Sequence, residues 1–510
     1  MSDIPSNKLF NITQYCLENN AVHQPEKTAL IFASDNGEDE RWTFRDFYDA
    51  VQQMAMALRS FHLPRFSRVM IRLDNTTDYA LAFFASIAAE LVPLPASPLL
   101  TTKEVVTLLN DAEARMVITA TPFSLPDGKL SKDCQVVDIE ELTSKTQHGP
   151  SFEAPQTHFD DPAFLIYTSG TTSTPKGVLH AQRNAWGRRP MIEGWSGLTH
   201  DDIVLHAGQL NWTYTLGVGL IDTWSVGATT VLYHGEKNPM VWPILIEKYK
   251  VTVFATVPTL YRQILKYGHV EKHDLSSLRY GLTAGEPLPP TLLDAWREQA
   301  GTELYEALGM SEISTYISSS PSVPTRPGCP GKPQKGRNVT ILPIEGGEEP
   351  LPPGKIGLLA IHRSDPGLML GYWKREEEEK EVFRGEWFIG GDLAQIDEDG
   401  YVWYHGRNND LMNTFGYRTS PLEIESVFMK HPQITEVGVT EITVSDDVAI
   451  IAAFVVPKGS DSLDKEELMS WVNSQLAVYK RPKEIRFVQQ LPHTSNGKII
   501  RRKLGELEYH

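Results

Sequence analysis

The chain has 510 residues, of which 41% are hydrophobic and 22% are charged, and its formal net charge is −17. These values are ordinary for a globular protein and exclude a disordered or coiled-coil chain, and the length predicts roughly two to four domains or subdomains. The acidic balance argues against a nucleic-acid binder, although a local cationic site could still hold an anionic ligand.

Cysteine usage and the first residues indicate a reducing compartment. Cys16, Cys134 and Cys329 are far apart and form no Cys-x-x-Cys pair, so they predict neither a disulfide framework nor a zinc site. The segment 1–5 lacks the basic and apolar regions of a signal peptide, and no run approaches the ~18 apolar residues of a membrane span. We therefore expect a cytoplasmic protein without a membrane span.

The first part of the chain alternates between helical and strand patterns. Apolar residues at Phe47, Val51, Met54 and Leu58 predict an amphipathic helix over 44–61. A strand over 69–73, a helix over 79–91 and a strand over 116–119 follow. Further strands are predicted at 228–232, 251–255 and 278–281. This alternation predicts an α/β fold built on doubly wound sheets.

A Pro/Gly-rich loop at 321–336 interrupts this pattern. A β-rich subdomain follows, and the acidic run 376–379 predicts a solvated helical face. The last hundred residues predict a helix at 421–430, strands at 437–439 and 450–456, a helix at 465–476 and a strand at 485–488. We therefore expect a large N-terminal domain, 1–408, and a small mobile α+β domain, 409–510.

The most informative segment follows a predicted apolar strand at 163–166. It contains hydroxyl residues, a glycine and a lysine, namely Thr168, Ser169, Gly170, Thr171, Thr172 and Lys176. Hydroxyl and backbone N–H groups in such a turn can surround phosphate oxygens, and a lysine adds positive charge. A flexible linker is the alternative, but linkers seldom follow a buried strand directly. The segment is not a Walker A loop, because Lys176 lies between Pro175 and Gly177.

The segment 167–177, Y-T-S-G-T-T-S-T-P-K-G, resembles the signature loop of the adenylate-forming superfamily, which comprises acyl- and aryl-CoA synthetases, luciferases and the adenylation domains of peptide synthetases. It departs from the usual pattern at Ser173, where a glycine is common. Further stretches resemble the family's motifs in the family's order, and the resemblance covers residues 44–504. These stretches are A-G-E-P-L-P at 284–289, L-G-M-S-E at 308–312, W-F-I-G-G-D at 387–392, G-R-N-N-D at 406–410 and L-P-H-T-S-N-G-K-I at 491–499.

The resemblance implies an ATP site assembled from these motifs. It implies that Glu312 holds Mg²⁺, that Asp392 and Arg407 face the ribose, and that Lys498 contacts the reacting carboxylate and the α-phosphate. Thr168 would join Glu312 and Lys498 as a catalytic residue. The remaining residues implied at the nucleotide are those of the loop together with Ala284, Gly285, Glu286, Pro287, Leu308, Gly309, Met310 and Ser311.

The resemblance also implies two half-reactions. A carboxylic acid is activated as its acyl-adenylate with release of pyrophosphate, and coenzyme A then displaces AMP. The small domain would turn about Asn409 between these steps and present Gly416, Tyr417 and Arg418 to coenzyme A. The implied acyl pocket contains Trp212, Thr213, Tyr214 and Gly309. Because related acetyl-CoA synthetases carry tryptophan at the position of Gly309, we expect an acid larger than acetate: short- to medium-chain, branched or aromatic.

Three alternatives stay open at the level of sequence. The acyl group could go to a separate carrier protein instead of free coenzyme A. A luciferase-like oxidation is a more remote alternative within the same superfamily. From a different class, the chain could be a non-catalytic nucleotide-binding regulator, although Lys176, Glu312, Asp392 and Lys498 argue against that. The expected partner is a small-molecule carboxylic acid and not a nucleic acid, and a homodimer is left open.

Overall fold

The computed structural model describes residues 9–35, 38–120, 134–144, 152–168, 175–408, 412–414, 417–445, 448–459, 463–476, 480–493 and 499–507. The chain divides into two compact units. The first comprises Met1–Asn338 and His362–Glu386, and the second comprises Val339–Ile361 and Trp387–His510. The division that we predict at residues 408 and 409 stays a prediction, since 409–411 lie outside the described ranges.

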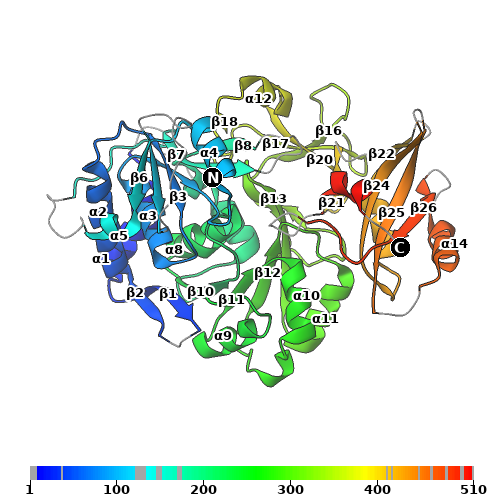
Figure 1. The fold of residues 1–510 in the computed structure, drawn as a ribbon, viewed down its shortest axis with the longest axis horizontal. Helices are drawn as coiled ribbons and strands as arrows, with labels where there is room; N and C mark the ends of the chain where they lie inside the picture. The colour runs from blue at the N-terminus through cyan, green and yellow to red at the C-terminus, as the bar shows by residue number, and fades with distance from the viewer. Residues whose placement is uncertain are drawn as a thin grey trace. The chain divides into compact units, whose positions relative to one another are not determined.

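A nine-stranded sheet forms the centre of the first unit (Figure 1). Six neighbouring strands are parallel, and antiparallel strands extend the sheet at both edges. The order is β15 (Lys332–Pro333), β14 (Ser314–Ser318), β13 (Glu303–Met310), β12 (Tyr280–Ala284), β11 (Val253–Thr256), β9 (Ile203–His206), β10 (Thr229–His234), β1 (Thr28–Ser34) and β2 (Glu40–Thr43).

Helices cover this sheet because each presents an apolar stripe to it. On one face, Trp242, Tyr261 and Trp296 are fully buried against Leu205 and Phe254 of the sheet. They come from α9 (Val241–Tyr249), α10 (Pro258–Tyr267) and α11 (Pro290–Ala300). The other face packs against helical turns that include α7 (Arg189–Met191), η3 (Ile192–Ser196), η4 (Thr215–Asp222) and α8 (Thr223–Ser225), and α6 (Asn184–Gly187) precedes α7.

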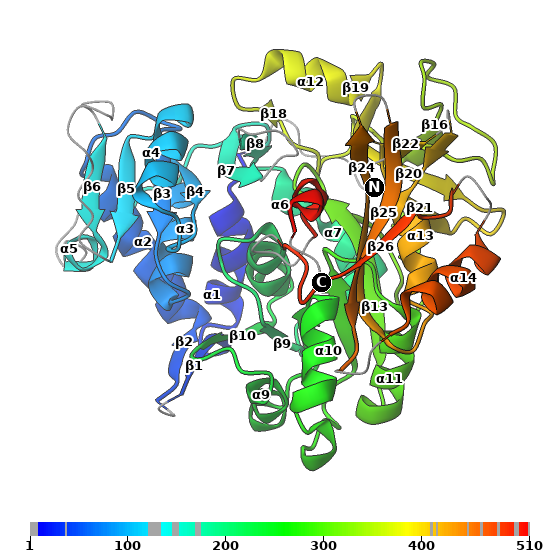
Figure 2. The same cartoon turned by 45° about the vertical axis from the view of Figure 1, so that its right-hand side comes forward.

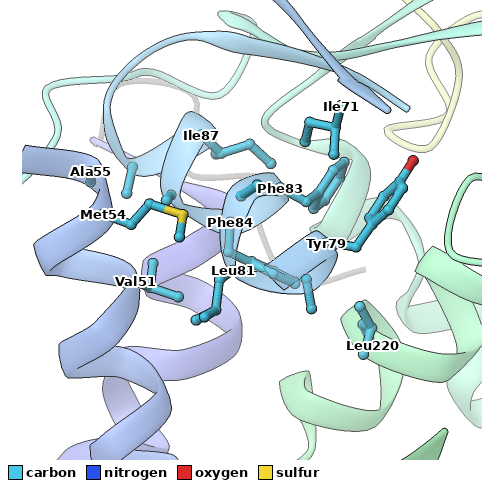
Figure 3. Packing of buried hydrophobic residues seen from close by; sticks show 14 of the residues in the cluster. Val51, Met54, Ala55, Ile71, Tyr79, Leu81, Phe83, Phe84, Ile87 and Leu220 are labelled. Carbon is cyan, nitrogen blue, oxygen red and sulfur yellow. The ribbon is translucent and has the colours of Figure 1, made fainter. Parts of the chain in front are cut away.

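A second, parallel sheet has the order β4 (Val92–Pro95), β3 (Arg68–Arg72), β5 (Met116–Thr119) and β6 (Gln135–Asp138). Its helices are α2 (Phe44–Arg59), α3 (Thr77–Ala88), α4 (Thr102–Asp111) and α5 (Ile139–Ser144), and η1 (Gln14–Glu18) and α1 (Asn19–His23) precede them. Figure 3 shows Val51 and Met54 of α2 packing beside Phe84 of α3. The predicted alternation of helices and strands is therefore confirmed.

A third, antiparallel sheet joins distant parts of the sequence. The hairpin of β7 (Pro162–Thr168) and β8 (Lys176–Ala181) pairs with β18 (Gly371–Tyr372). Figures 1 and 2 show these three strands side by side. After β18 the chain forms α12 (Glu376–Val382) and β19 (Phe383–Arg384).

The second unit is α+β, as predicted for its C-terminal part. Its sheets contain β16 (Val339–Leu342), β17 (Gly357–His362), β20 (Trp387–Ile396) and β21 (Val402–Arg407), then β22 (Met412–Thr414) and β23 (Tyr417–Thr419), then β24 (Ile434–Ser445), β25 (Val448–Pro457) and β26 (Glu484–Phe487). The helices are α13 (Pro421–Phe428), α14 (Lys465–Gln475) and η8 (Arg501–Glu506). Ile424, Phe428 and Val472 pack on the strands of this core.

Among the described residues, no helix combines the length and the apolarity needed to cross a bilayer. All three cysteines are free thiols, and Cys16 and Cys329 are buried.

A buried ion pair ties several loops of the first unit together. The Arg337 guanidinium is fully buried and lies 2.7 Å from the Asp365 carboxylate, whose exposed fraction is 3%. Arg337 also donates hydrogen bonds to Gln334, to the Gly187 carbonyl and to the Thr315 carbonyl. Such a pair adds little net stability over an apolar replacement, but losing one partner leaves an uncompensated buried charge.

We therefore expect Arg337→Ala to lower the free energy of unfolding by about 3–5 kcal/mol, because the Asp365 carboxylate would stay buried without its partner. Urea-induced unfolding followed by tryptophan fluorescence measures this change. The matched control is Arg297→Ala, which removes a partly exposed pair with Glu303 and should cost ~1 kcal/mol or less. Equal losses in both variants would contradict this role of Arg337.

Candidate active site

The hairpin β7–β8 brings the two ends of the predicted phosphate loop together. Thr168, the last residue of β7, is the register partner of Lys176, the first residue of β8. The intervening residues predicted at the phosphates, Ser169, Gly170, Thr171 and Thr172, lie outside the described ranges. The described ends alone therefore place a hydroxyl residue opposite a lysine at the loop end of the hairpin.

Lys176 and Glu312 meet at the ring of Tyr372. The Lys176 ammonium lies 5.4 Å from the centroid of that ring, within the range of a cation–π contact. The Tyr372 hydroxyl donates a hydrogen bond of 2.7 Å to the Glu312 carboxylate. The same ammonium lies 2.5 Å from the carboxylate of Glu378 on α12. Two residues predicted from separate motifs thus belong to one cluster, which contains one cation and two carboxylates.

Backbone hydrogen bonds position this cluster. Leu370 N–H donates to the Leu179 carbonyl and Trp373 N–H donates to the Gly177 carbonyl, which fixes Tyr372 beside β8. Met369 N–H donates to the Glu312 carbonyl at 2.8 Å. The segment 369–373 therefore bridges the lysine strand and the turn that carries Glu312.

A buried histidine supports the same turn. His180 on β8 is 1% exposed and stacks on Phe164, and burial lowers its pKa to about 3. The neutral ring donates from Nε2 to the Ser311 carbonyl at 2.8 Å, which leaves Nδ1 to accept from the Asn184 amide. His180 is a positioning residue that the sequence analysis missed. The sequence did offer a signal for this role, because His180 is a polar residue within the apolar pattern of β8, the strand that follows the loop.

The two motifs predicted along the adenine follow neighbouring strands. Ala284 ends β12 and is the register partner of Ala307 on β13, so 285–287, which follow β12, and 308–310, which end β13, come next in the two chains at the carboxyl edge of the sheet. Ligands of open α/β sheets bind at this edge. Gly285 has a φ of +93°, and Glu286 accepts a hydrogen bond of 2.7 Å from Thr259. Pro287 and Leu308 lie in these same two segments.

Gly309 is required by a close approach of the backbone. A Cβ atom at this position would lie 2.3 Å from the Ser314 carbonyl oxygen and 2.6 Å from the Thr315 Cα. The cause is the tight connection from β13 to β14, where the register shifts between Leu308 and Gly309 and Ser314 has a φ of +72°. The glycine therefore has a local structural reason that is independent of any substrate.

The aromatic residues predicted for an acyl pocket precede η4. Trp212, Thr213 and Tyr214 are each half-buried. The Tyr214 hydroxyl donates to the Leu282 carbonyl at 3.1 Å, and its ring stacks on Trp195.

His206, at the end of β9, lies edge-on to the Tyr214 ring with 4.5 Å between centroids. Burial lowers the pKa of His206 to about 3, so this ring is neutral as well. Its Nδ1 accepts from Gly208 N–H, whereas the buried Nε2 finds no hydrogen-bond partner in the described part of the chain. The sequence analysis missed His206 because a single histidine at a strand end carries no pattern.

In the second unit, the residues predicted at the ribose are register partners. Asp392 on β20 lies opposite Arg407 on β21, and their charged groups are 3.0 Å apart. Asp392 is 2% exposed and accepts a hydrogen bond from Tyr404. Gly391 has a φ of +84°, and no atom lies within 4 Å of the position of a Cβ there. The buried Asp392 carboxylate thus follows Gly391 directly, and the space beside the Gly391 backbone is open.

The C-terminal motif is described only at its ends. His493 and Ile499 form an antiparallel bridge, and Ile500 N–H donates to the Pro492 carbonyl. Lys498, Gly416 and the predicted hinge residue Asn409 lie outside the described ranges. Tyr417 and Arg418 belong to the short strand β23.

Magnesium ligation fits this cluster only in part. In the residues described, no group of three or more His, Cys, Asp or Glu side chains is arranged to hold a metal ion. Protein-bound Mg²⁺ is usually held by one or two carboxylates together with phosphate oxygens and water. Glu312 can supply such a carboxylate, whose Oε1 accepts a hydrogen bond from Tyr372.

Comparison with known proteins agrees with the predicted family along the whole chain. The AMP-binding enzyme family matches residues 17–373, and the AMP-binding enzyme C-terminal domain matches residues 423–498. A Bacillus subtilis (strain 168) protein named as an uncharacterized acyl-CoA ligase is 31% identical over 95% of this chain and 93% of its own length. The acetyl-coenzyme A synthetase of the same organism is 30% identical over 98% and 90%.

A solved structure has the same fold. The crystal structure of the anthranilate CoA ligase AuaEII in complex with anthranoyl-AMP has a TM-score of 0.89 and 30% identity, covering 99% of this chain and 98% of that one. The expected α/β architecture is thereby confirmed. The chain therefore belongs to the AMP-binding enzyme family, as one of its acyl- and aryl-CoA ligases.

Proposed function

We propose that this ATP-dependent acid–thiol ligase activates a carboxylic acid larger than acetate. The acid's oxygen attacks the α-phosphorus of ATP, which gives an acyl-adenylate and pyrophosphate. The thiol of coenzyme A then attacks the acyl carbon, which gives the thioester and AMP. No covalent intermediate on the protein is needed, so the protein positions the reactants and neutralises charge.

The main observation in support of ATP binding is the cluster of Lys176, Tyr372 and Glu312. A lysine at the end of a hydroxyl-rich loop can neutralise phosphate oxygens as a point charge. Glu312 would hold Mg²⁺, which supplies further neutralisation of the phosphates when bound. Their contacts with one tyrosine ring support a shared task at the same triphosphate.

The remaining ATP contacts follow from the described motifs. The segments 284–287 and 308–311 lie along the adenine, where Leu308 offers an apolar surface to the base. Thr168 and Ser311 place hydroxyl groups at the phosphates. Asp392 accepts hydrogen bonds from the ribose hydroxyls, and its pairing with Arg407 orients the carboxylate.

Lys498 is proposed as the catalytic cation of adenylation. It would bind the oxygens that gain negative charge as the acid attacks the α-phosphate, where a positioned cation acts most strongly. Asn409 is the proposed pivot that removes Lys498 for the second half-reaction and brings Gly416, Tyr417 and Arg418 to coenzyme A. A glycine at 416 would allow the pantetheine arm to pass close to the backbone.

The residues around Tyr214 and Gly309 would set the size of the acid that the proposed pocket accepts. Because a Cβ at residue 309 would collide with the Ser314 carbonyl, a bulky residue there would require a different β13–β14 connection. The larger pocket is supported instead by the resemblance, since related acetyl-CoA synthetases carry tryptophan where this chain has Gly309. The buried Nε2 of His206 beside Tyr214 favours an acid with a polar substituent or ring edge. The similarity to an anthranilate ligase supports an aromatic acid of that size.

Replacing Lys498 with alanine should slow adenylation by about 10²–10³-fold, the usual cost of removing one group that stabilises a developing charge. Thioester formation from a supplied acyl-adenylate should fall far less. Pyrophosphate release with the acid present measures the first step, and acyl-CoA formation measures the second. Lys503→Ala, on η8, is the matched control. Equal losses in both half-reactions would refute the role assigned to Lys498.

Replacing Asn409 with proline should spare adenylation and impair thioester formation, because proline fixes the φ angle that a pivot has to change. The same two assays separate the steps. Asn408→Pro, at the neighbouring position, tests whether the effect belongs to one residue. A variant that loses adenylation but keeps thioester formation would exclude Asn409 as the pivot.

The acid itself can be identified with a panel. We expect kcat/KM to be higher for benzoate-sized or branched acids than for acetate by about tenfold or more, since each buried methylene contributes on the order of 1 kcal/mol. Coenzyme A-dependent AMP formation is the measurement. If acetate has the highest kcat/KM, the pocket argument from Gly309 is wrong.

A further inference from the structure

Glu378 departs from the solvated helical face that the sequence predicts for the acidic run of α12. Glu377 follows that prediction, since its side chain is 86% exposed and pairs with Lys380. Glu378 is instead 35% exposed, and its Oε2 lies 2.5 Å from the Lys176 ammonium, which is 22% exposed. The Glu378 carboxylate therefore forms an ion pair with Lys176, the lysine at the end of the phosphate loop.

Other residues hold this carboxylate in place. The second oxygen of Glu378 lies 3.7 Å from Nε of Arg375. Arg375 in turn pairs with Asp111 at the end of α4, at 2.7 Å. Asp111 also accepts a hydrogen bond of 2.6 Å from the hydroxyl of Tyr167, the residue just before Thr168. Both strands that flank the loop are thus connected to α12 through one chain of ion pairs that ends in the hydrogen bond of Tyr167.

This geometry sets up a competition for Lys176. Its ammonium is enclosed by the Glu378 carboxylate on one side and the Tyr372 ring on another. A phosphate group that bound the same ammonium would bring its negative charge close to Glu378. Two like charges about 4 Å apart repel appreciably near a protein surface. The ammonium therefore cannot serve the carboxylate and a phosphate equally well.

We propose that Glu378 is a positioning residue that holds the Lys176 ammonium while the loop is empty and is displaced by the phosphates of ATP. This rests on the proposed function, in which Lys176 binds phosphate. Glu378 accordingly weakens the binding of ATP, and it takes the ammonium back when pyrophosphate leaves. The pair sets how strongly the site retains polyphosphate, without contacting the acid or coenzyme A.

The test compares Glu378→Gln with Glu377→Gln, two neutralising substitutions on the same short helix. For Glu378→Gln we expect the KM for ATP and the inhibition constant of pyrophosphate to fall roughly twofold to fivefold, the range of a partly exposed ion pair. The KM values for the acid and coenzyme A should not change. Glu377→Gln should match the unmodified enzyme in every value. An unchanged or raised KM for ATP in Glu378→Gln would overturn the proposal.

A double-mutant cycle separates this inference from the function on which it rests. Lys176→Met should raise the KM for ATP, and adding Glu378→Gln to that variant should have no further effect. If Lys176→Met leaves ATP affinity unchanged, the phosphate role of Lys176 fails. If Lys176→Met weakens ATP but Glu378→Gln behaves like Glu377→Gln, only the competition fails. If Glu378→Gln strengthens ATP binding even without Lys176, the effect is a general change of charge and the pairing is refuted.

Discussion

Backbone hydrogen bonds between β8 and the segment 369–373 hold together parts of the chain that are distant in sequence. Leu179 and Gly177 accept from Leu370 and Trp373, and the same segment donates from Met369 to the Glu312 carbonyl. These bonds are insensitive to side-chain identity, so they fix the frame in which chemistry-bearing side chains can be placed. Lys176, Tyr372 and Glu312 come together because three backbone segments do: β8, β18 and the turn between β13 and β14.

The local charge of this cluster has the same sign as the charge of the whole protein. The chain is acidic overall, and the lysine at the end of the loop is paired with the Glu378 carboxylate. An anionic nucleotide is therefore not attracted by a general positive field, and under the proposed function its binding depends on short contacts with a few cations and on a metal ion. Beneath the site, buried pairs such as Arg188 with Asp222 supply rigidity, since each charge is satisfied only in one arrangement.

Much of the fold could be predicted from the sequence because its periodicity is strong. The helix over 44–61 and the strand over 116–119 form nearly as expected, since their apolar spacing matches a single buried face. The short strand β18 and the pairing of β8 could not be predicted. Two residues such as Gly371 and Tyr372 carry no pattern, and their partner lies far away in the sequence.

The motifs predicted which residues belong to the candidate site, but they did not predict the contacts that join those residues. Glu312 and Lys176 were both expected at the phosphates, but nothing in either motif indicates the tyrosine between them. His180, His206 and Glu378 were missed for a related reason, because each acts through a contact that only the tertiary structure creates.

The two neutral histidines make the stability of the folded protein depend on pH. His180 and His206 each have a pKa of about 3 in the folded protein, against about 6.5 in an unfolded chain. Between these values the unfolded chain takes up protons that the folded chain refuses, so the folded state loses stability as the pH falls below about 6.5. The hydrogen bond from His180 to Ser311 keeps its direction throughout that window. Mild acid therefore lowers the free energy of unfolding at pH values well above those that protonate these two rings in the folded protein.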